Sequence, residues 1–335
     1  MWIEPQFPLS PDGPVVVHDV PDAVLTTFSQ GPLRVAWGQP NRFVSGAAYT
    51  ADGVLVPDSQ RIGGMSFDHA LSVDPPRLPP WDGNTADLSG TWLYGGTWFN
   101  HFGHFLTETV TTLWPEVSVD GLVFHPFWFG GEVLPWQQQM LRLLGDSRAP
   151  RVVGSDRLRV ERLLVPTRPY LPNGYARPEA VQVWRRMAAS ARDRAGAGPR
   201  RVFLSRSAHH AALAQAGRPS RRASPNEPAV DALFASRGYV VAHPEQLDLT
   251  AQIRLVADAD VLAGVSGSAL HLSVFAPPGA RVVEVADARA RSKPVTTQVI
   301  LAHACEQALA FVKYPRGASG YDLDRLRRAL AELGV

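Results

Sequence analysis

Cysteine is almost absent from this sequence, which contains a single one, Cys305. One cysteine excludes an intrachain disulfide and a metal site built on several cysteines, and it suits a reducing compartment. The sequence also lacks an uninterrupted apolar stretch of about 18 residues, so we expect no transmembrane helix. The first residues lack a basic segment followed by an apolar run, so we expect no secretory signal. These features favour a cytoplasmic protein, and they leave peripheral contact with a membrane open.

A large charge imbalance is lacking as well. The chain has 33 Lys and Arg against 31 Asp and Glu, which gives a net charge of +2. Total charge therefore predicts no general attraction to nucleic acid. Hydrophobic residues make up 45% and charged residues 19%, which is typical of a globular protein and excludes a disordered one. A length of 335 residues exceeds one ordinary hydrophobic core and predicts two domains.

The first half of the chain predicts a mixture of short strands and a few helices. Residues 1–90 are rich in Pro, Gly and Asp with short apolar runs, which predicts strands and loops. Apolar periodicity predicts a helix over residues 100–114. Further elements are expected at residues 122–125, 151–153 and 159–165 as strands and at 135–144 as a helix. A helix over residues 177–195 is the candidate connection between the two domains.

The second half has a regular rhythm. Strands and helices alternate over residues 196–310, which predicts a parallel, doubly wound sheet. The continuous apolar run at 261–265 supports this prediction because a parallel sheet is buried on both faces. Asn226 and Thr250 are the expected caps of two of the helices. The last predicted helix, over residues 322–333, is amphipathic.

A block of arginines is the first candidate site. No acidic residue occurs between residues 195 and 225, and the block directly follows a predicted strand and leads into the helix that Asn226 begins. Arginine donors and a helix N-terminus both suit phosphate, so the block indicates a dianionic ligand such as a diphosphate. The alternative is a solvated surface loop. The block contains Arg200, Arg201, Arg206, Arg218, Arg221 and Arg222.

A glycine-containing turn is the second candidate site. It spans residues 264–271 and joins a predicted buried strand to a helix. Small residues such as Gly267 and Ser268 let backbone N–H groups approach a ligand closely, although an ordinary strand-to-helix turn would look the same. Glu284, at the end of the next predicted strand, is expected to face the same crevice, where it could contact a ribose or sugar hydroxyl or cap a neighbouring loop.

A helical segment with histidines is the third candidate site. His104 and Glu108 are four residues apart and therefore share a helical face. A carboxylate beside an imidazole in an aromatic setting could have a raised pKa and act as a general base. A hydrogen bond that only satisfies two half-buried groups is the alternative. A metal site on His101 and His104 is a further alternative, although the spacing differs from known zinc helices.

Two Asp-x-Asp pairs could suggest a metal-dependent sugar transferase. They occur at residues 258–260 and 322–324, where both are better interpreted as helix-end or capping residues. We therefore predict no essential metal and no cofactor. His209 and His210 lie within the basic segment, and we expect both to be solvated.

Several motifs in order resemble glycosyltransferase family 61, as its bacterial members have them. The resemblance covers roughly residues 95–290. It includes the helix from Asn100 to Glu108, and a strand that ends in Ser205-Arg206. The remaining matches are Arg222, Asn226 and Glu227, then Gln252-Ile253, and finally the stretch 266–272 with Phe275, Pro278-Gly279 and Glu284 after it. Ser266 stands where the family usually has histidine, and Leu272 where it has asparagine.

The resemblance implies a GT-B architecture of two Rossmann-like lobes with a cleft between them, a nucleotide-sugar donor, inversion at the anomeric carbon and no catalytic metal. We expect residues 1–175 to bind the acceptor and to carry extra short strands, and residues 176–312 to bind the donor. Residues 313–335 form a helix that is expected to pack back on the N-terminal lobe.

These patterns together predict an inverting, metal-independent hexosyl- or pentosyltransferase of glycan or polysaccharide biosynthesis. Its substrates would be a nucleotide sugar, with a UDP-sugar favoured, and a glycan or other acceptor that carries a hydroxyl. The predicted roles are Glu108 as general base, His104 as its orienting partner, and Asn100 and His101 as acceptor contacts. The predicted donor contacts are Arg206, Arg222, Asn226, Gly267, Ser268, His271 and Glu284. A non-catalytic glycan- or nucleotide-binding relative and a metal-assisted hydrolase remain as alternatives.

Overall fold

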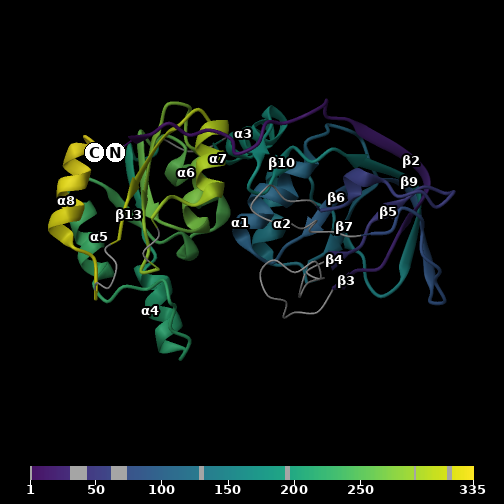
Figure 1. Cartoon of the computed structure of the whole chain (residues 1–335), viewed down its shortest axis with the longest axis horizontal. Helices are drawn as coiled ribbons and strands as arrows, with labels where there is room; N and C mark the ends of the chain where they lie inside the picture. The colour runs from purple at the N-terminus through teal and green to yellow at the C-terminus, as the bar shows by residue number, and fades with distance from the viewer. Residues whose placement is uncertain are drawn as a thin grey trace. The chain divides into compact units, whose positions relative to one another are not determined.

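The computed structural model describes residues 2–30, 44–61, 74–127, 132–192, 197–289, 292–314 and 319–335. The chain divides into two compact units (Figure 1). The N-terminal unit comprises Pro8–Val183, and the C-terminal unit comprises Met1–Phe7 together with Trp184–Val335. The sequence placed the boundary between residues 175 and 176 and assigned residues 1–7 to the N-terminal lobe. The acceptor and donor roles of the two parts, and their GT-B arrangement, stay predictions.

The N-terminal unit contains a six-stranded mixed sheet in the order β5-β2-β9-β6-β7-β8. The strands are β2 (Val17–Leu25), β5 (Ala48–Tyr49), β6 (Thr85–Trp98), β7 (Gly121–Pro126), β8 (Arg151–Val152) and β9 (Arg157–Pro166). The strands β9, β6, β7 and β8 pair with one another in parallel. The strand β2 pairs antiparallel with both β9 and β5. Buried Val, Leu and Ala side chains of these strands form the core of the unit.

The predicted helix over residues 100–114 is a succession of three helical segments. It begins with α1 (Phe102–His104), continues as a π-helical turn η2 (Phe105–Thr109) and ends as the 3₁₀ segment η3 (Val110–Leu113). Thr107, Thr111 and Thr112 donate hydrogen bonds back to main-chain carbonyls one turn earlier. Such bonds compete with regular helix geometry, and π-turns occur frequently at functional sites.

The other elements of this unit are short. They are β3 (Ser29–Gln30), β4 (Val44–Ser45), η1 (Pro57–Ser59), α2 (Pro135–Leu143), β10 (Tyr170–Leu171) and β11 (Tyr175–Ala176). The predicted connecting helix is α3 (Pro178–Arg192), in which the division between the units falls after Val183. The last residues predicted for it, 193–195, lie outside the described residues.

The C-terminal unit contains the doubly wound sheet that the alternation predicts. Its order is β1-β16-β15-β14-β12-β13, and all neighbours pair in parallel except the edge strand β1. The strands are β1 (Trp2–Ile3), β12 (Arg201–Leu204), β13 (Val240–Ala242), β14 (Val261–Val265), β15 (Arg281–Val285) and β16 (Ala308–Val312). Every residue of β14 is buried, as its apolar sequence predicts. The mixed α/β structure fits a Rossmann-like glycosyltransferase fold.

Helices flank this sheet, with α5 and α8 on one side and α6 and α7 on the other (Figure 1). They are α4 (Ser207–Gln215), α5 (Glu227–Ser236), α6 (Leu249–Val256), α7 (Thr296–Ala304) and α8 (Leu323–Glu332), with the 3₁₀ segments η4 (Pro244–Gln246) and η5 (Ser268–Phe275). Asp248, rather than the predicted Thr250, caps α6 by accepting a hydrogen bond from the N–H of Ala251. No helix in the described ranges is long and apolar enough to span a membrane.

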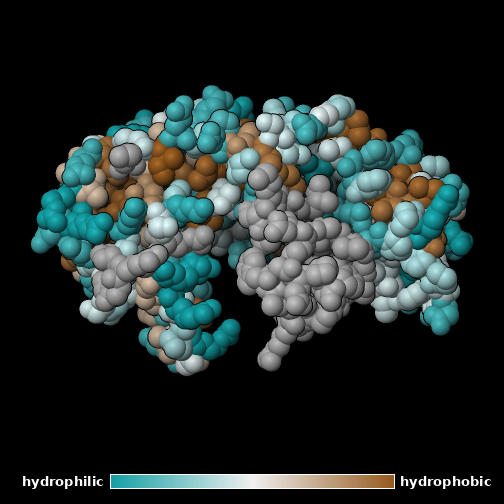
Figure 2. Space-filling model, in the orientation of Figure 1, coloured by the Kyte–Doolittle hydropathy of each residue, from teal (hydrophilic) through white to brown (hydrophobic). Residues whose placement is uncertain are grey.

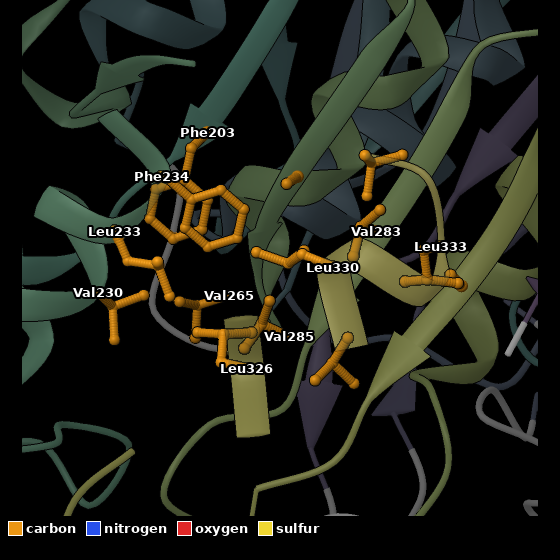
Figure 3. Packing of buried hydrophobic residues seen from close by; sticks show 14 of the residues in the cluster. Phe203, Val230, Leu233, Phe234, Val265, Val283, Val285, Leu326, Leu330 and Leu333 are labelled. Carbon is orange, nitrogen blue, oxygen red and sulfur yellow. The ribbon is translucent and has the colours of Figure 1, made fainter. Parts of the chain in front are cut away.

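The core between the sheet and helices α5 and α8 is continuous (Figure 3). The rings of Phe203 and Phe234 stack with centroids 3.8 Å apart. Leu326 and Leu330 of α8 are buried in the same cluster, so this helix packs within the C-terminal unit rather than on the N-terminal lobe as predicted. The outward side of α8 carries exposed Asp and Arg residues and is hydrophilic in Figure 2.

Candidate functional site

The histidine segment lies at the carboxyl edge of the N-terminal sheet. It follows β6, and Phe127 follows the parallel neighbour β7. In α/β sheets this edge is the usual position of ligand sites. Phe99, Asn100 and His101 connect the end of β6 to α1, so sheet topology places them there.

A buried ion pair organises this segment. Arg61 Nε donates to Glu108 Oε2 at 2.7 Å, and Arg61 Nη2 donates to Oε1 at 3.0 Å. The imidazole Nδ1 of His104 lies 2.6 Å from the same Oε1. The Arg61 and Glu108 side chains are 9% and 6% exposed, whereas that of His104 is 48% exposed. The predicted i,i+4 contact between His104 and Glu108 is thus present, and Arg61 is a partner that the sequence analysis missed.

The electrostatics of Glu108 differ from our expectation. Burial by itself raises the pKa of this carboxyl, but the positive charge of Arg61 and the hydrogen bond with His104 outweigh burial and lower the pKa to about 2. The predicted raised pKa is therefore wrong, and Glu108 is ionised at neutral pH. An ionised carboxylate only accepts hydrogen bonds, so Nδ1 of His104 donates, and in the neutral form of the imidazole the lone pair is at Nε2.

The surroundings of His104 are aromatic on one side and open on the other. Its ring stacks on Phe99 with centroids 5.2 Å apart, and the ring of His101 lies 5.0 Å away. His101 and Asn100 are exposed, and Asn100 Oδ1 accepts a hydrogen bond from Gln137 Nε2 at 3.2 Å. The two predicted acceptor residues therefore lie on the surface beside His104. The described residues include no group of three or more His, Cys, Asp or Glu side chains that could hold a metal ion.

The second candidate site lies at the switch point of the C-terminal sheet. The chain runs from β12 to β13 on one side and then returns to β14 on the other side of β12. Arg206 follows β12, and Gly267 follows β14, so both residues lie at the carboxyl ends of the two strands that flank the reversal. Ligands of open α/β sheets bind at this point of the topology.

Two arginines converge on the Gly267 turn. A Cβ atom placed on Gly267 would lie 3.2 Å from Nη1 of Arg206 and 3.3 Å from Nη1 of Arg222. Gly267 also has φ = 149° and ψ = 179°, a backbone conformation that residues other than glycine rarely adopt. The turn therefore requires glycine for its backbone, and the absent side chain leaves the space that the two guanidinium groups enter.

The structure places the other arginines of the basic block in different surroundings. Arg200 forms an ion pair with Asp260, and the guanidinium of Arg201 lies over the ring of Tyr239. Arg218 and Arg221 are exposed. Arg206 is half-buried, and its Nε is a buried donor with no hydrogen-bond partner among the residues that the structure describes.

Charged neighbours surround Arg206. Burial lowers the pKa of Arg206, and the carboxylates of Glu245, Glu227 and Asp287 act in the opposite direction. A guanidinium in such a setting stays charged at neutral pH.

The remaining residues that were predicted to contact the donor differ in their exposure. Gly267 and Ser268 are half-buried at the turn itself. Glu284 is fully buried, where it accepts hydrogen bonds from the hydroxyl of Ser266 and the N–H of Val295. It therefore supports the turn from beneath, as the loop-capping alternative describes, and its contact with a sugar hydroxyl stays a prediction.

The side chains of His271 and Asn226 form hydrogen bonds with other residues of the C-terminal unit. His271 is buried, with Nδ1 3.1 Å from the amide oxygen of Gln298. The amide of Asn226 exchanges two hydrogen bonds, both of 2.8 Å, with the main chain of Tyr321. Asn226 occupies the N-cap position of α5, but its side chain does not cap the helix.

His210 also differs from its prediction, because it is buried rather than solvated. Its Nδ1 lies 2.8 and 2.9 Å from the two carboxylate oxygens of Glu227. His209 is half-buried. Neither the burial of His210 nor the role of Arg61 has a local signal, because their partners are 17 and 47 residues away in the chain.

A comparison with known protein families finds a match. The family described as Glycosyltransferase 61 matches residues 102–283, just over half of the chain. The matched region begins at α1 and ends within β15, so it includes His104, Glu108, Arg206, Arg222 and Gly267. Arg61 lies outside it. A comparison with curated proteins gives no match.

Proposed function

The chain belongs to glycosyltransferase family 61, and from this membership and the geometry of its two sites we propose that it transfers a sugar from a nucleotide-diphosphate sugar to an acceptor hydroxyl. The membership itself establishes a glycosyltransferase. The donor class, the inverting course of the reaction and the roles of single residues are part of the proposal.

One observation carries the donor assignment, the convergence of Arg206 and Arg222 on the Gly267 turn. Two guanidinium groups beside a side-chain-free backbone form a site that favours a compact dianion. A diphosphate has that charge, and its bond to the sugar breaks with an electron pair moving to the phosphate oxygen. Fixed positive charge stabilises this leaving group without a metal ion. We therefore propose a metal-independent reaction in which these arginines offset the growing charge.

The base in this proposal is His104 rather than Glu108. Both oxygens of Glu108 already accept hydrogen bonds, and its pKa of about 2 makes it a weak base. The half-exposed imidazole has a lone pair at Nε2, which can take the proton from an acceptor hydroxyl while that oxygen bonds to the anomeric carbon. Glu108 then orients the ring and stabilises the imidazolium that forms. A single displacement of this kind inverts the anomeric centre.

The finer features of the substrates stay predictions from the sequence. They are a UDP-sugar as donor, transfer of a hexosyl or pentosyl group, and a glycan or other acceptor beside Asn100 and His101.

Calorimetric titration with UDP tests the donor site. Each charge-assisted hydrogen bond is worth about 1.5–3 kcal/mol, so Arg222→Ala should weaken UDP binding by roughly 10- to 100-fold. Arg221→Ala is the matched control because this adjacent arginine is exposed. Equal affinity of both variants and the wild type would remove the arginine pair from the donor site.

Turnover separates an enzyme from a binding protein. Wild-type protein should release UDP from a nucleotide sugar in the presence of a suitable acceptor from a panel of sugars and glycans. If the protein binds UDP but releases none from the nucleotide sugar with any acceptor of the panel, it is a non-catalytic relative instead.

A further inference from the structure

The buried guanidinium of Arg61 has a role that no family match assigns to it. We infer that Arg61 is a positioning residue, which fixes the carboxylate of Glu108 so that Glu108 holds the imidazole of His104 in one orientation and tautomer. This inference rests on the proposed function, in which His104 takes the proton of the acceptor.

The geometry of the ion pair supports this role. Arg61 contacts both oxygens of Glu108, at 2.7 and 3.0 Å, which fixes the plane of the carboxylate as well as its position. The oxygen Oε1 is shared, because it also lies 2.6 Å from Nδ1 of His104. A rotation of the carboxylate would therefore break the contact with the imidazole, and Arg61 prevents that rotation.

An aromatic pair holds Arg61 in turn. Its guanidinium carbon lies 4.9 Å from the ring centre of Phe99 and 5.1 Å from that of Phe127. These distances are typical of cation–π contacts, which are stronger where water is excluded. Phe99 also stacks on His104. The same ring, fixed at the end of β6, therefore orients both Arg61 and the histidine.

The charge of Arg61 is the second argument for its positioning role. The groups that act on Glu108 are Arg61 and His104, and the half-buried Arg168 also interacts with it electrostatically. Burial alone would raise the pKa of Glu108, so loss of Arg61 should raise the pH at which the carboxyl takes up a proton. A protonated carboxyl can itself donate a hydrogen bond, and it would no longer select the Nδ1–H tautomer of His104.

Three variants of the full-length protein test the inference. Arg61→Gln removes the charge, Arg61→Lys keeps the charge but loses the two-point contact, and Arg157→Gln is the control. Arg157 is also a buried arginine of this unit that lies over an aromatic ring, that of Trp81, and it donates to the carbonyl of Pro79. It makes none of the contacts described for Glu108.

The first readout is the titration of the Glu108 carboxyl by ¹³C NMR, with the signal assigned by its loss in Glu108→Gln. The midpoint should rise by about one pH unit or more in Arg61→Gln and stay low in Arg61→Lys. The second readout is steady-state transfer. The kcat of Arg61→Gln should fall about 10-fold or more at neutral pH and fall further as the medium becomes acidic, while its affinity for UDP and the kcat of Arg157→Gln stay at wild-type values.

An unchanged Glu108 titration together with unchanged kcat in Arg61→Gln would overturn the inference. So would an equal loss of kcat in Arg157→Gln at an equal fall in Tm, because a general loss of stability would then explain both. If Arg61→Gln fails to fold, Arg61→Lys decides, since it should retain the low midpoint and lose part of kcat. The NMR readout needs no substrate, so a wild type that transfers no sugar would refute the proposed function while the titration still tests Arg61.

Discussion

At the scale of single residues, the proposed mechanism divides the two requirements of a general base between His104 and Glu108. One is access to the acceptor, which the half-exposed imidazole has, and the other is a fixed orientation, which the buried carboxylate provides. In hydrolytic triads, too, a histidine acts as the base and an acidic residue orients it. Here both residues come from one helical segment.

Substitution of the two residues should have different consequences. His104→Gln should reduce kcat by roughly 10²- to 10⁴-fold, and its stability should change by less than about 1 kcal/mol because its partner contact is half-exposed. Glu108→Gln should reduce kcat too, and it should also cost about 3–5 kcal/mol of stability because Arg61 is left buried without its carboxylate. Kinetics and urea unfolding measure the two effects.

The stability effect should depend on pH. The pKa of Glu108 is about 2 in the folded chain against an ordinary value of 4.5, so its contribution is present above about pH 4.5 and declines as the pH falls toward 2. The difference in unfolding free energy between wild type and Glu108→Gln should therefore shrink between pH 6 and pH 3. A constant difference over that range would show that Glu108 is not the group responsible.

Sequence reasoning at this scale finds pairs that are close in the chain. The spacing of His104 and Glu108 predicted their contact, and the motif order predicted Arg206, Arg222 and Gly267 as a group. It could not find Arg61, because a contact across 47 residues leaves no periodic signal. It also could not find the contacts that Glu284 and Asn226 make with neighbouring loops, since a polar residue that contacts a loop looks the same in the sequence as one that faces substrate.

At the scale of elements, the turn between β14 and η5 is the feature on which the proposed donor site depends. Its backbone conformation and the approach of two guanidinium groups both require the absence of a side chain. Ser266 and Glu284 support the turn from the interior. Ser266 can therefore replace the family's usual histidine and still make a buried hydrogen bond there.

Gly267→Ala should separate these requirements. The added Cβ would meet both arginines, so UDP binding should weaken by at least about 10-fold, which corresponds to the loss of one charge-assisted contact. Gly279→Ala is the control, because Gly279 also has a positive φ, +78°, but nothing lies within 4 Å of its Cβ position. Both variants should lose stability from backbone strain, of the order of 1 kcal/mol, while only Gly267→Ala changes the calorimetric affinity.

The alternation of strands and helices in the C-terminal unit was predictable, because continuous apolar strands such as β14 have a strong local pattern. The types of the shorter helices were not. Apolar spacing does not distinguish an α-helix from the 3₁₀ segment η5 or the π-turn η2. In η2, the hydroxyl of Thr107 donates to the carbonyl of Gly103, a contact that apolar spacing does not reveal.

At the scale of the whole molecule, each unit has its own sheet and its own hydrophobic core. The proposed diphosphate contacts belong to the C-terminal unit alone. A ligand stabilises the structure that binds it, by about 2.7 kcal/mol when its free concentration is a hundredfold above Kd.

Hydrogen exchange of the full chain should therefore respond to UDP in one unit. Amides of residues 201–222 and 261–270 should exchange more slowly with UDP, and those of residues 85–98 should not change. Protection confined to residues 85–98 would place the nucleotide in the N-terminal unit and contradict the donor assignment.

The domain prediction treated each lobe as one continuous stretch of chain, and the pairing of β1 with β16 shows why it misplaced residues 1–7. Trp2 lies opposite Ala310, so the partner of one of the earliest residues is more than 300 positions away. During synthesis from the N-terminus, β1 must wait until almost all of the chain has emerged. Until then the flank of β16 that β1 covers does not exist, and afterwards an unoccupied flank would be a template for strands of other molecules. By pairing with β16, β1 covers a flank that would otherwise be open to strands of other molecules.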